Sequence, residues 1–517
     1  MTYGSPNLGL TAAILHSGHI LPGSAGDPFP ASHIVLALTS LLTGLPLFTI
    51  SLIAPAMYFC FYTVMLWVIG KTLFSRRAAA ILMALIGIPV YSTVFDVPSI
   101  AYYIPRNFYF ATMFPIAILL VYKSLNRVSL TNTVLIIITF AVLPLYHSFD
   151  AFLLALASFP VLVLGHAFDL RRSRGLAALF RRPDAHFPVS YVRFTLPLLV
   201  LVMTLLVWFD RTVWFQSYVS GLTTLLQASS GLSYAASRFS ALGFSLQSEV
   251  ATVFFRTGSE WPYFTMGAVV SFVFFSRLLR RHAAQKRPIP VYGFLAAITF
   301  IIFFGIAAVS VLTPLSWLSG GGETRVESYL VFFAGLSVVS LFNNKPSRNS
   351  GWTKRRLLIV AALIVGLTAN SALGSYSIFG SPHSLWMNMQ VTKSDVVGLS
   401  WFSVYEEQSL PVFYTYMSLQ DMIVAQTGNF SSLNNVPGIG DPPTHFCYNL
   451  TEFGKCISQS HYFISNTLSE EWEPVVYPTS PAHWEWSPSD YSHLLNDPSV
   501  ALVYSDGGLQ IYLISLT

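Results

Sequence analysis

Between residues 47 and 373 the chain alternates long apolar runs with short polar segments. A helix needs roughly 20 apolar residues to cross the hydrocarbon core of a bilayer, and most of these runs approach that length. The pattern therefore predicts about ten transmembrane helices: Leu47–Gly70, Ala78–Phe95, Asn107–Tyr122, Val128–Tyr146, Ala151–Phe168, Phe194–Phe209, Trp261–Ser276, Ile289–Pro314, Glu327–Phe342 and Leu357–Leu373.

The composition supports this interpretation. Hydrophobic residues make up 53% of the 517 residues and charged residues only 10%, whereas about a quarter of the residues of a soluble domain are charged. An ordinary soluble enzyme is thereby excluded, and so is a disordered or fibrous protein. The net charge of +5 is too small and too scattered to indicate binding of nucleic acid.

The positive charges predict the orientation of the helices. Of the 28 Lys and Arg residues, 21 lie in alternate loops, beginning with the loop at residues 71–77. Such loops remain in the cytoplasm. Most acids of the membrane region, among them Asp96, Glu323 and Glu327, map to the opposite side. We therefore expect a multi-pass protein of the cell membrane, or of the endoplasmic reticulum membrane in a eukaryote, with its chemistry on the outer face.

The chain divides into three predicted parts. Residues 1–46 form a first outer loop with an interfacial helix, residues 47–373 form the transmembrane domain with a long outer loop at 210–260, and residues 374–517 form an extracytoplasmic domain. In the last part we expect a helix over 392–408, strands at Val412–Tyr416, His461–Ser465 and Val475–Tyr477, and a closing hairpin that turns at Asp506–Gly508. The fold class is an all-α polytopic membrane bundle with a small α/β or α+β domain.

The N-terminal region lacks the basic and then apolar pattern of a signal peptide. If residues 1–46 lie outside, a helix is needed to carry them there. We therefore expect that a first transmembrane helix is missing from this sequence and is supplied by another chain or by sequence upstream.

Two features of the C-terminal domain fit an oxidising, extracytoplasmic compartment. Cys447 and Cys456 lie close together and are expected to form a disulfide, whereas Cys60 lies within a predicted helix. Asn429 and Asn449 each begin an Asn-X-Ser/Thr triplet, the acceptor pattern for glycosylation.

The first outer loop collects groups that could carry acid–base chemistry. His16, His19, Asp27 and His33 lie within 18 residues beside the membrane. Such a group can deprotonate a hydroxyl or hold a divalent ion, here Mg or Mn. The alternative is an interfacial turn in which His33 satisfies backbone groups. No zinc-binding spacing is present, so a structural metal site is not predicted.

Cations at two other outer positions suit a phosphate. Arg106 follows Asp96 and Tyr103 at the mouth of a helix pair, and Arg325 lies between Glu323 and Glu327 after three glycines. An interfacial arginine can bind phosphate through two hydrogen bonds; the alternatives are a snorkelling anchor for Arg106 and a structural Glu–Arg pair for Arg325.

A weaker pair, His147 and Asp150, opens a predicted helix on the same side.

Five segments of the chain carry a further pattern: His19-Ile-Leu-Pro, Phe29-Pro-Ala-Ser-His33-Ile-Val-Leu-Ala, Leu42-Thr-Gly-Leu-Pro46, Tyr103-Ile-Pro-Arg106 and Val503-Tyr-Ser-Asp-Gly-Gly-Leu-Gln-Ile-Tyr512. They resemble segments of integral-membrane glycosyltransferases of the GT-C superfamily, in particular archaeal members akin to dolichyl-phosphate-mannose mannosyltransferases. The resemblance implies a helical bundle, an acidic catalytic residue in the first outer loop, a cavity for a polyprenyl-phosphate-linked sugar and inversion at the anomeric carbon.

The chain departs from this family pattern in one respect. The family's acid follows the first helix directly, but here Asp27 is the one acid in that loop and lies later. The sequence also lacks the Trp-Trp-Asp signature of oligosaccharyltransferases, which argues against transfer of a whole glycan to asparagine.

The leading hypothesis is a membrane glycosyltransferase that transfers a sugar on the outer face to a glycan, lipid or protein acceptor. Asp27 is then the candidate base, His19 and His33 position the substrate, and Arg106 and Arg325 bind the lipid phosphate. Asp96, Tyr103, Glu323, Glu327 and His147 are expected to line the substrate cavity. The alternatives are a non-catalytic polytopic subunit that scaffolds a larger complex and, third, a transporter, although few ionisable residues lie within the helices.

Overall fold

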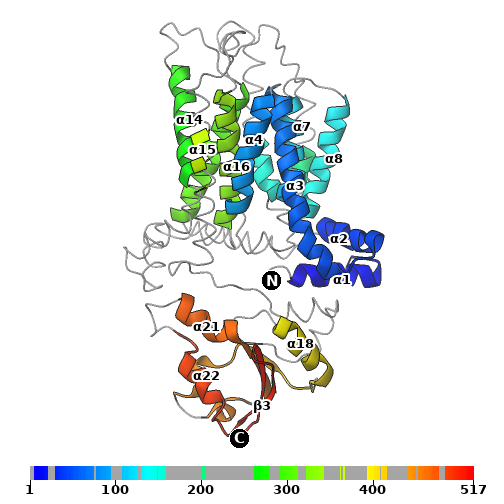
Figure 1. Ribbon diagram of the computed structural model, residues 1–517, viewed down its shortest axis with the longest axis vertical. Helices are drawn as coiled ribbons and strands as arrows, with labels where there is room; N and C mark the ends of the chain where they lie inside the picture. The colour runs from blue at the N-terminus through cyan, green and yellow to red at the C-terminus, as the bar shows by residue number, and fades with distance from the viewer. Residues whose placement is uncertain are drawn as a thin grey trace.

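A computed structural model shows a mostly helical chain with one small sheet. The structure describes residues 5–20, 30–74, 77–94, 108–124, 130–147, 150–158, 199–203, 206, 261–279, 291–312, 322–342, 361–362, 365–366, 369, 393–407, 409–415, 440–449, 452–476 and 484–517. Figure 1 shows the two parts that these residues form: a bundle of upright helices and, beyond one end of it, a unit with the sheet.

The bundle is built from helices whose sequences are apolar on all sides. They are α3 (Leu47–Phe74), α4 (Arg77–Val94), α7 (Phe114–Ser124), α8 (Leu130–Tyr146), α14 (Trp261–Leu279), α15 (Val291–Leu312) and α16 (Gly322–Phe342). Their buried residues form one continuous core, in which the rings of Phe110, Phe114 and Tyr329 are fully enclosed. At 1.5 Å per residue, α3 is about 40 Å long.

Within the described residues, one helix, Thr49–Phe74, is long and apolar enough to cross a bilayer, and eight further apolar helices are shorter. The expected ten crossings therefore remain a prediction. Two helices precede the bundle, α1 (Ser5–Ser17) and α2 (Pro30–Thr43), and Figure 1 shows them beside the foot of α3. Helix α2 occupies the segment for which an interfacial helix is predicted, whereas α1 was not expected. Leu38, Leu41 and Leu42 of α2 are exposed.

One predicted α-helix begins with a turn of π-helix. The segment expected as a single α-helix from Asn107 opens with a π-helical turn, η1 (Tyr109–Met113), before α7. A π-turn contains one residue more than an α-helical turn, so it changes the rotation of one part of the helix relative to the other. Such turns are frequent at functional sites.

The sheet has the strand order β1-β2-β4-β3, from β1 (Val412–Tyr414), β2 (His461–Asn466), β3 (Val500–Ser505) and β4 (Leu509–Ile514). Strands β1 and β2 are parallel and the other pairs are antiparallel. Gly507 takes a φ of +88° in the turn between β3 and β4, as expected for this hairpin.

Helices cover both faces of the sheet, as Figure 1 shows. Helix α18 (Lys393–Tyr405) packs on one face through Leu399 and Phe402. The other face carries the 3-10 turns η5 (Thr444–Cys447) and η6 (Phe453–Cys456) and helix α22 (Pro488–Leu494).

The strand predicted at Val475–Tyr477 is wrong at Val475 and Val476, because both belong to the helix α21 (Thr467–Val476); Tyr477 lies outside the described residues. Its start is fixed by Asn466, whose side-chain oxygen accepts a hydrogen bond from the Ser469 backbone N–H at 2.9 Å. That contact is an N-cap, which favours a helix.

Candidate functional site at one end of the bundle

The two ends of the bundle differ in charge. Lys71 and Arg77 lie on either side of the turn from α3 to α4, and Lys123 lies at the last turn of α7. Phe74 contacts Tyr292, at the start of α15, with ring centroids 6.3 Å apart. These contacts place the end of α3, the start of α4 and the start of α15 together at a basic end.

The opposite end, which we call the acidic end, holds the start of α16. A side chain added at Gly293 of α15 would meet Ser340, near the last turn of α16, so α16 ends at the basic end and begins at the other. Figure 1 shows α1, α2 and the unit with the sheet beyond this second end. Lys71, Arg77 and Lys123 thus lie at one end of the bundle, and the C-terminal unit lies beyond the other end.

A buried pair of ionisable side chains lies in the half of the bundle toward the acidic end. His147 follows α8 directly, and its Nδ1 lies 2.9 Å from Oδ2 of Asp150. Asp150 is 1% exposed and His147 4%. In a low-dielectric interior such a pair must be closely matched to offset the cost of desolvation. The weakly predicted pair is therefore a real contact, and it is packed rather than open to solvent.

Two tyrosines from distant parts of the chain converge on Asp150. The hydroxyl of Tyr109, in η1, donates to the backbone carbonyl of Asp150 at 3.1 Å, and the hydroxyl of Tyr329, in α16, donates to the same oxygen at 2.9 Å. Both tyrosines are fully buried. Phe303 stacks on the Tyr329 ring with centroids 5.0 Å apart, so the hydroxyl is held in place.

Each tyrosine follows one of the two predicted phosphate-binding arginines closely in the sequence. Arg325 precedes Tyr329 by four residues within α16, which places it one helical turn nearer the acidic end on the same face. Arg106 precedes Tyr109 by three residues, and it lies outside the described residues. Glu323 and Glu327 belong to the first turns of α16. Asp27, Asp96 and Tyr103 also lie outside the described residues.

The two described histidines of the predicted catalytic group differ in environment. His33 is completely buried in α2, a helix that packs against α1, α3 and α8. His19 is exposed just after α1, and its Nδ1 lies 3.0 Å from the carbonyl of Ser17. Among the described residues, no three His, Cys, Asp or Glu side chains are grouped to hold a metal. The divalent ion expected beside Asp27 remains a prediction.

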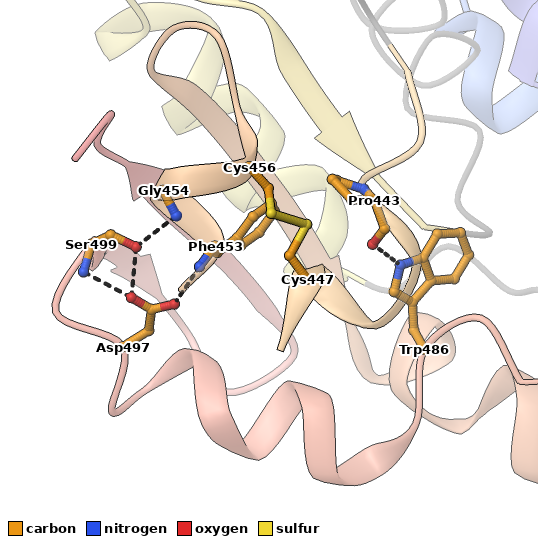
Figure 2. Close-up of a disulfide and its surroundings, with 8 residues drawn as sticks. All are labelled: Pro443, Cys447, Phe453, Gly454, Cys456, Trp486, Asp497 and Ser499. Atoms are coloured by element: carbon orange, nitrogen blue, oxygen red, sulfur yellow. Dashed lines mark hydrogen bonds between the residues drawn. A yellow bond between two sulfur atoms is a disulfide. The ribbon is translucent and has the colours of Figure 1, made fainter. Parts of the chain in front are cut away.

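The C-terminal unit contains the predicted cysteine pair. Cys447 and Cys456 form a disulfide that joins η5 to η6, with Cα atoms 6.5 Å apart, as Figure 2 shows. Asn449 is exposed two residues after Cys447, and Asn429 lies outside the described residues. Next to the disulfide, Asp497 accepts hydrogen bonds from the backbone N–H groups of Phe453 and Ser499 at 3.0 and 2.8 Å.

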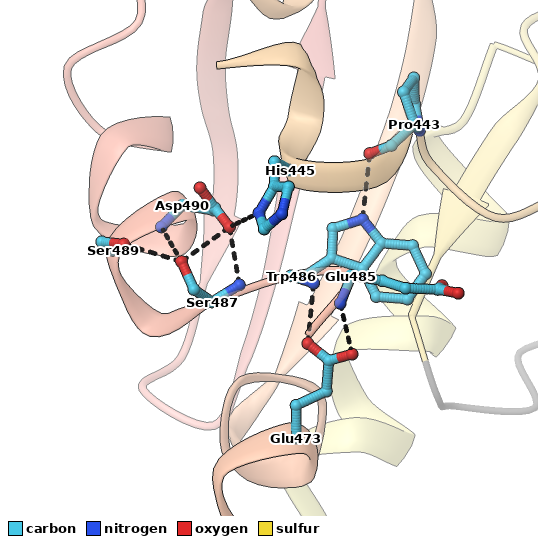
Figure 3. A network of polar contacts seen from close by, with 8 residues as sticks. All are labelled: Pro443, His445, Glu473, Glu485, Trp486, Ser487, Ser489 and Asp490. Atoms are coloured by element: carbon cyan, nitrogen blue, oxygen red, sulfur yellow. Dashed lines mark hydrogen bonds and ion pairs between the residues drawn. The ribbon is translucent and has the colours of Figure 1, made fainter. Parts of the chain in front are cut away.

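A second polar network, drawn in Figure 3, fixes the turn before Cys447. His445, Phe446 and Cys447 all have positive φ, between 45° and 63°, a conformation that non-glycine residues adopt only where their surroundings impose it. The His445 ring lies 2.8 Å from Asp490 Oδ2. Burial raises the pKa of the Asp490 carboxyl, but hydrogen bonds from His445 and Ser487 outweigh it and hold the pKa below its ordinary value.

Sequence reasoning missed Tyr109 and Tyr329 as members of the candidate site. Tyr109 follows Arg106 by three residues, and Tyr329 follows Arg325 by four. That spacing is the signal that could have found them, because residues three or four apart share a helix face.

No protein-family model and no curated protein matches the chain. Among solved structures, it is similar to the oligosaccharyltransferase of Archaeoglobus fulgidus in complex with Zn and sulfate, at 13% identity and a TM-score of 0.48 over 99% of this chain and 69% of that one. It is also similar to ArnT from Cupriavidus metallidurans in the apo state, at 13% identity and a TM-score of 0.46 over 99% and 93% of the two chains. ArnT bound to undecaprenyl phosphate gives a TM-score of 0.40 at the same identity and coverage.

The arabinofuranosyltransferase AftD from Mycobacteria is similar at 11% identity and a TM-score of 0.42, over 99% of this chain and 40% of that one. At these identities and TM-scores the similarity assigns no family, no function and no residue role to this chain.

Proposed function

We propose that the protein is a multi-pass membrane glycosyltransferase that transfers a sugar from a polyprenyl-phosphate-linked donor to an acceptor at the acidic end of the bundle, on the outer face. The observation that carries this proposal is the polarity of the bundle: Lys71, Arg77 and Lys123 lie at one end, and the start of α16 and the C-terminal unit lie at the other. Loops rich in Lys and Arg remain in the cytoplasm. A disulfide in the C-terminal unit supports an oxidising compartment for that end.

The outer compartment and the positive charge of the proposed site both indicate the class of sugar donor. Nucleotide sugars are scarce outside the cytoplasm, so a sugar carried on a membrane lipid is the sensible donor for an outward-facing site. Arg106 and Arg325 would bind its phosphate, because a guanidinium matches phosphate oxygens with two hydrogen bonds. Arg325 lies in the turn of α16 that precedes Tyr329, Arg106 is three residues before Tyr109 in the sequence, and both tyrosines bond the same carbonyl; these relations support the proposal of a shared site.

The proposed reaction is a single displacement. Asp27, with His19 positioning the substrate, would take the proton of an acceptor hydroxyl as its oxygen bonds to the anomeric carbon. His33 is completely buried in α2 and takes no part in this step. The bond from that carbon to the phosphate oxygen breaks on the opposite face, so the configuration inverts. The arginines stabilise the departing phosphate, on which negative charge develops.

Replacing Arg325 with alanine tests this assignment in the full-length protein reconstituted in lipid nanodiscs. We expect R325A to lose transfer from a polyprenyl-phosphate-linked hexose by about a hundredfold or more, as when one transition-state donor is removed, whereas R325K retains part of it. The matched control is K123A, which removes an exposed cation at the basic end and should leave transfer unchanged. Equal activity of R325A and K123A would refute the role of Arg325.

A non-catalytic subunit that scaffolds a larger complex is the second candidate. The burial of Asp150 favours it, because a carboxylate that is 1% exposed and paired with His147 does not reach an acceptor. Variants of Asp27 decide between the two functions. If D27N and wild type both lack transfer with every donor tested, while the protein copurifies with a fixed partner, the scaffold is the correct function.

A further inference from the structure

We propose that the C-terminal unit carries a carbohydrate-binding surface, on which a neutral oligosaccharide stacks against the rings of Trp401, Tyr405 and Tyr504. We call these three rings the aromatic platform. Two of them belong to α18 and the third to β3. The inference goes beyond the proposed function and does not rest on it, because binding at this surface requires no transfer reaction.

The three rings of the platform are in direct contact through Trp401. The Trp401 and Tyr504 rings are stacked, with centroids 4.9 Å apart and an interplanar angle of 28°, and the Trp401 and Tyr405 rings are 5.2 Å apart at 33°. Trp401 and Tyr504 are partly buried against the core beneath α18, whereas Tyr405 is 67% exposed. The platform therefore presents a large aromatic surface to the solvent.

The fold beneath the platform fixes its rings in advance. At Gly398, an added Cβ would lie 2.2 Å from a side-chain carbon of Leu509 and 3.0 Å from the Tyr504 ring. Glycine thus lets α18 approach the sheet closely, and Trp401, three residues further along the same helix face, reaches Tyr504. Phe402 anchors the inner side of α18 in the core. Rings that are already ordered lose little conformational freedom when a ligand binds.

Polar groups at the edge of the platform suit a sugar. The Tyr504 hydroxyl donates to Oδ2 of Asp506 at 3.2 Å, and Asp506 is exposed. A phenol that donates one hydrogen bond can still accept another from a ligand hydroxyl. The carboxylate is held in place, because its Oδ1 accepts the backbone N–H groups of Gly508 and Leu509 at 3.1 and 3.0 Å.

The chemistry of a pyranose matches this combination of groups. One face of the sugar ring carries C–H bonds, which are attracted to the negative face of an aromatic ring. Its rim carries hydroxyls, which form hydrogen bonds with the phenol and carboxylate oxygens. A mostly apolar surface with a few fixed polar groups is typical of a ligand site.

The position of Asp506 also distinguishes a sugar from two other occupants, a lipid bilayer and a second copy of the chain. Either of these would cover the platform with apolar groups and would desolvate the carboxylate at its edge, which is costly without a compensating partner. Sugar hydroxyls instead replace the hydrogen bonds of the displaced water. The disulfide between Cys447 and Cys456 supports an oxidising compartment for this unit, and cell-surface glycans are displayed in such a compartment.

The test uses the full-length protein in lipid nanodiscs, prepared without glycoside detergents because these carry sugars. The probes are linear tetrasaccharides of glucose, mannose and galactose, and binding is measured by saturation-transfer NMR and titration calorimetry. We expect at least one tetrasaccharide to bind saturably to wild type. Y405A should raise its Kd about tenfold, the value of a lost aromatic contact, whereas Y405F retains the ring and should stay within about threefold of wild type.

Two control variants remove exposed apolar side chains without removing a ring. V404A changes the residue next to Tyr405 in α18, and L495A changes the residue after α22, on the other face of the sheet; the two side chains are 72% and 64% exposed. Both variants should retain the wild-type Kd. Equal weakening of binding by Y405A and V404A would overturn the inference.

The remaining outcomes also overturn it, and they identify the alternative. A tetrasaccharide that binds wild type and Y405A equally is bound elsewhere, for example at the proposed transfer site. If no tetrasaccharide binds and both Y405A and V404A convert a dimer to a monomer in mass photometry, the occupant is a second copy of the chain. If no tetrasaccharide binds and a spin label at V404C, in a C60S background, is shielded by lipid from an aqueous relaxation agent, the occupant is the bilayer.

Discussion

Asp497 holds together the part of the C-terminal unit drawn in Figure 2, and its removal should loosen that part strongly. Its two oxygens accept the Phe453 backbone N–H at 3.0 Å, the Ser499 backbone N–H at 2.8 Å and the Ser499 hydroxyl at 2.6 Å. Phe453 is 0% exposed and Ser499 2%, so water does not readily replace the lost acceptor. Hydrogen bonds to a charged group contribute about 1.5–3 kcal/mol of stability each. A buried donor that is left without an acceptor lowers the stability by about 1–3 kcal/mol.

Taking only the two backbone N–H bonds, each at the lower value of about 1.5 kcal/mol, D497A should lower the local free energy of opening by at least about 3 kcal/mol. Hydrogen exchange of residues 452–457 and of β4, measured by mass spectrometry on the full-length protein, should then accelerate by more than a hundredfold. D497N retains one acceptor oxygen and should fall between D497A and wild type. The control D441A removes an exposed acid and should change exchange very little. Acceleration below tenfold in D497A, or equal to that in D441A, would refute the reasoning.

Two further predictions concern the same unit. Replacing Cys447 and Cys456 by serine opens a loop of about ten residues and should reduce the stability of the unit by about 2.5 kcal/mol; exchange of η5 and η6 measures it, and unchanged protection would contradict the prediction. Because the pKa of Asp490 is lowered in the folded state, its contribution is present at neutral pH and is lost as pH falls from the unfolded value near 3.8 through the folded value. Protection factors of α22 should fall over that range in wild type and not in D490N.

The sequence predicted best the features that depend on continuous patterns. The apolar run of α3, the helix α18 and the hairpin at Gly507 were all found, because hydrophobic runs and glycine turns are local signals. Helix α21 was predicted in part as a strand, since a short run with Val475 and Val476 does not distinguish the two structures. The Asn466 cap that decides the matter depends on a single side chain.

Other features could not be predicted from residue types. Left-handed backbone at His445, Phe446 and Cys447 contradicts the local preference of each residue, and it is imposed by contacts with segments more than 40 residues away, such as the contact of His445 with Asp490. The π-turn at Tyr109 has no sequence signal of its own either. Both therefore had to come from the tertiary structure, whereas the charge polarity of the bundle was already present in the sequence.

The free-energy cost of burying the His147–Asp150 pair bears on the function of the protein. A buried ion pair is often no more stable than well-packed apolar residues of the same size, so stability alone does not explain its presence in an apolar bundle. Ionisable residues in such a setting indicate a functional constraint. Here the pair holds the backbone of Asp150 between α8 and the helix that follows, at the one carbonyl where Tyr109 and Tyr329 meet. The pair thus constrains the position of one backbone oxygen, at which two segments that are distant in the sequence meet inside the bundle.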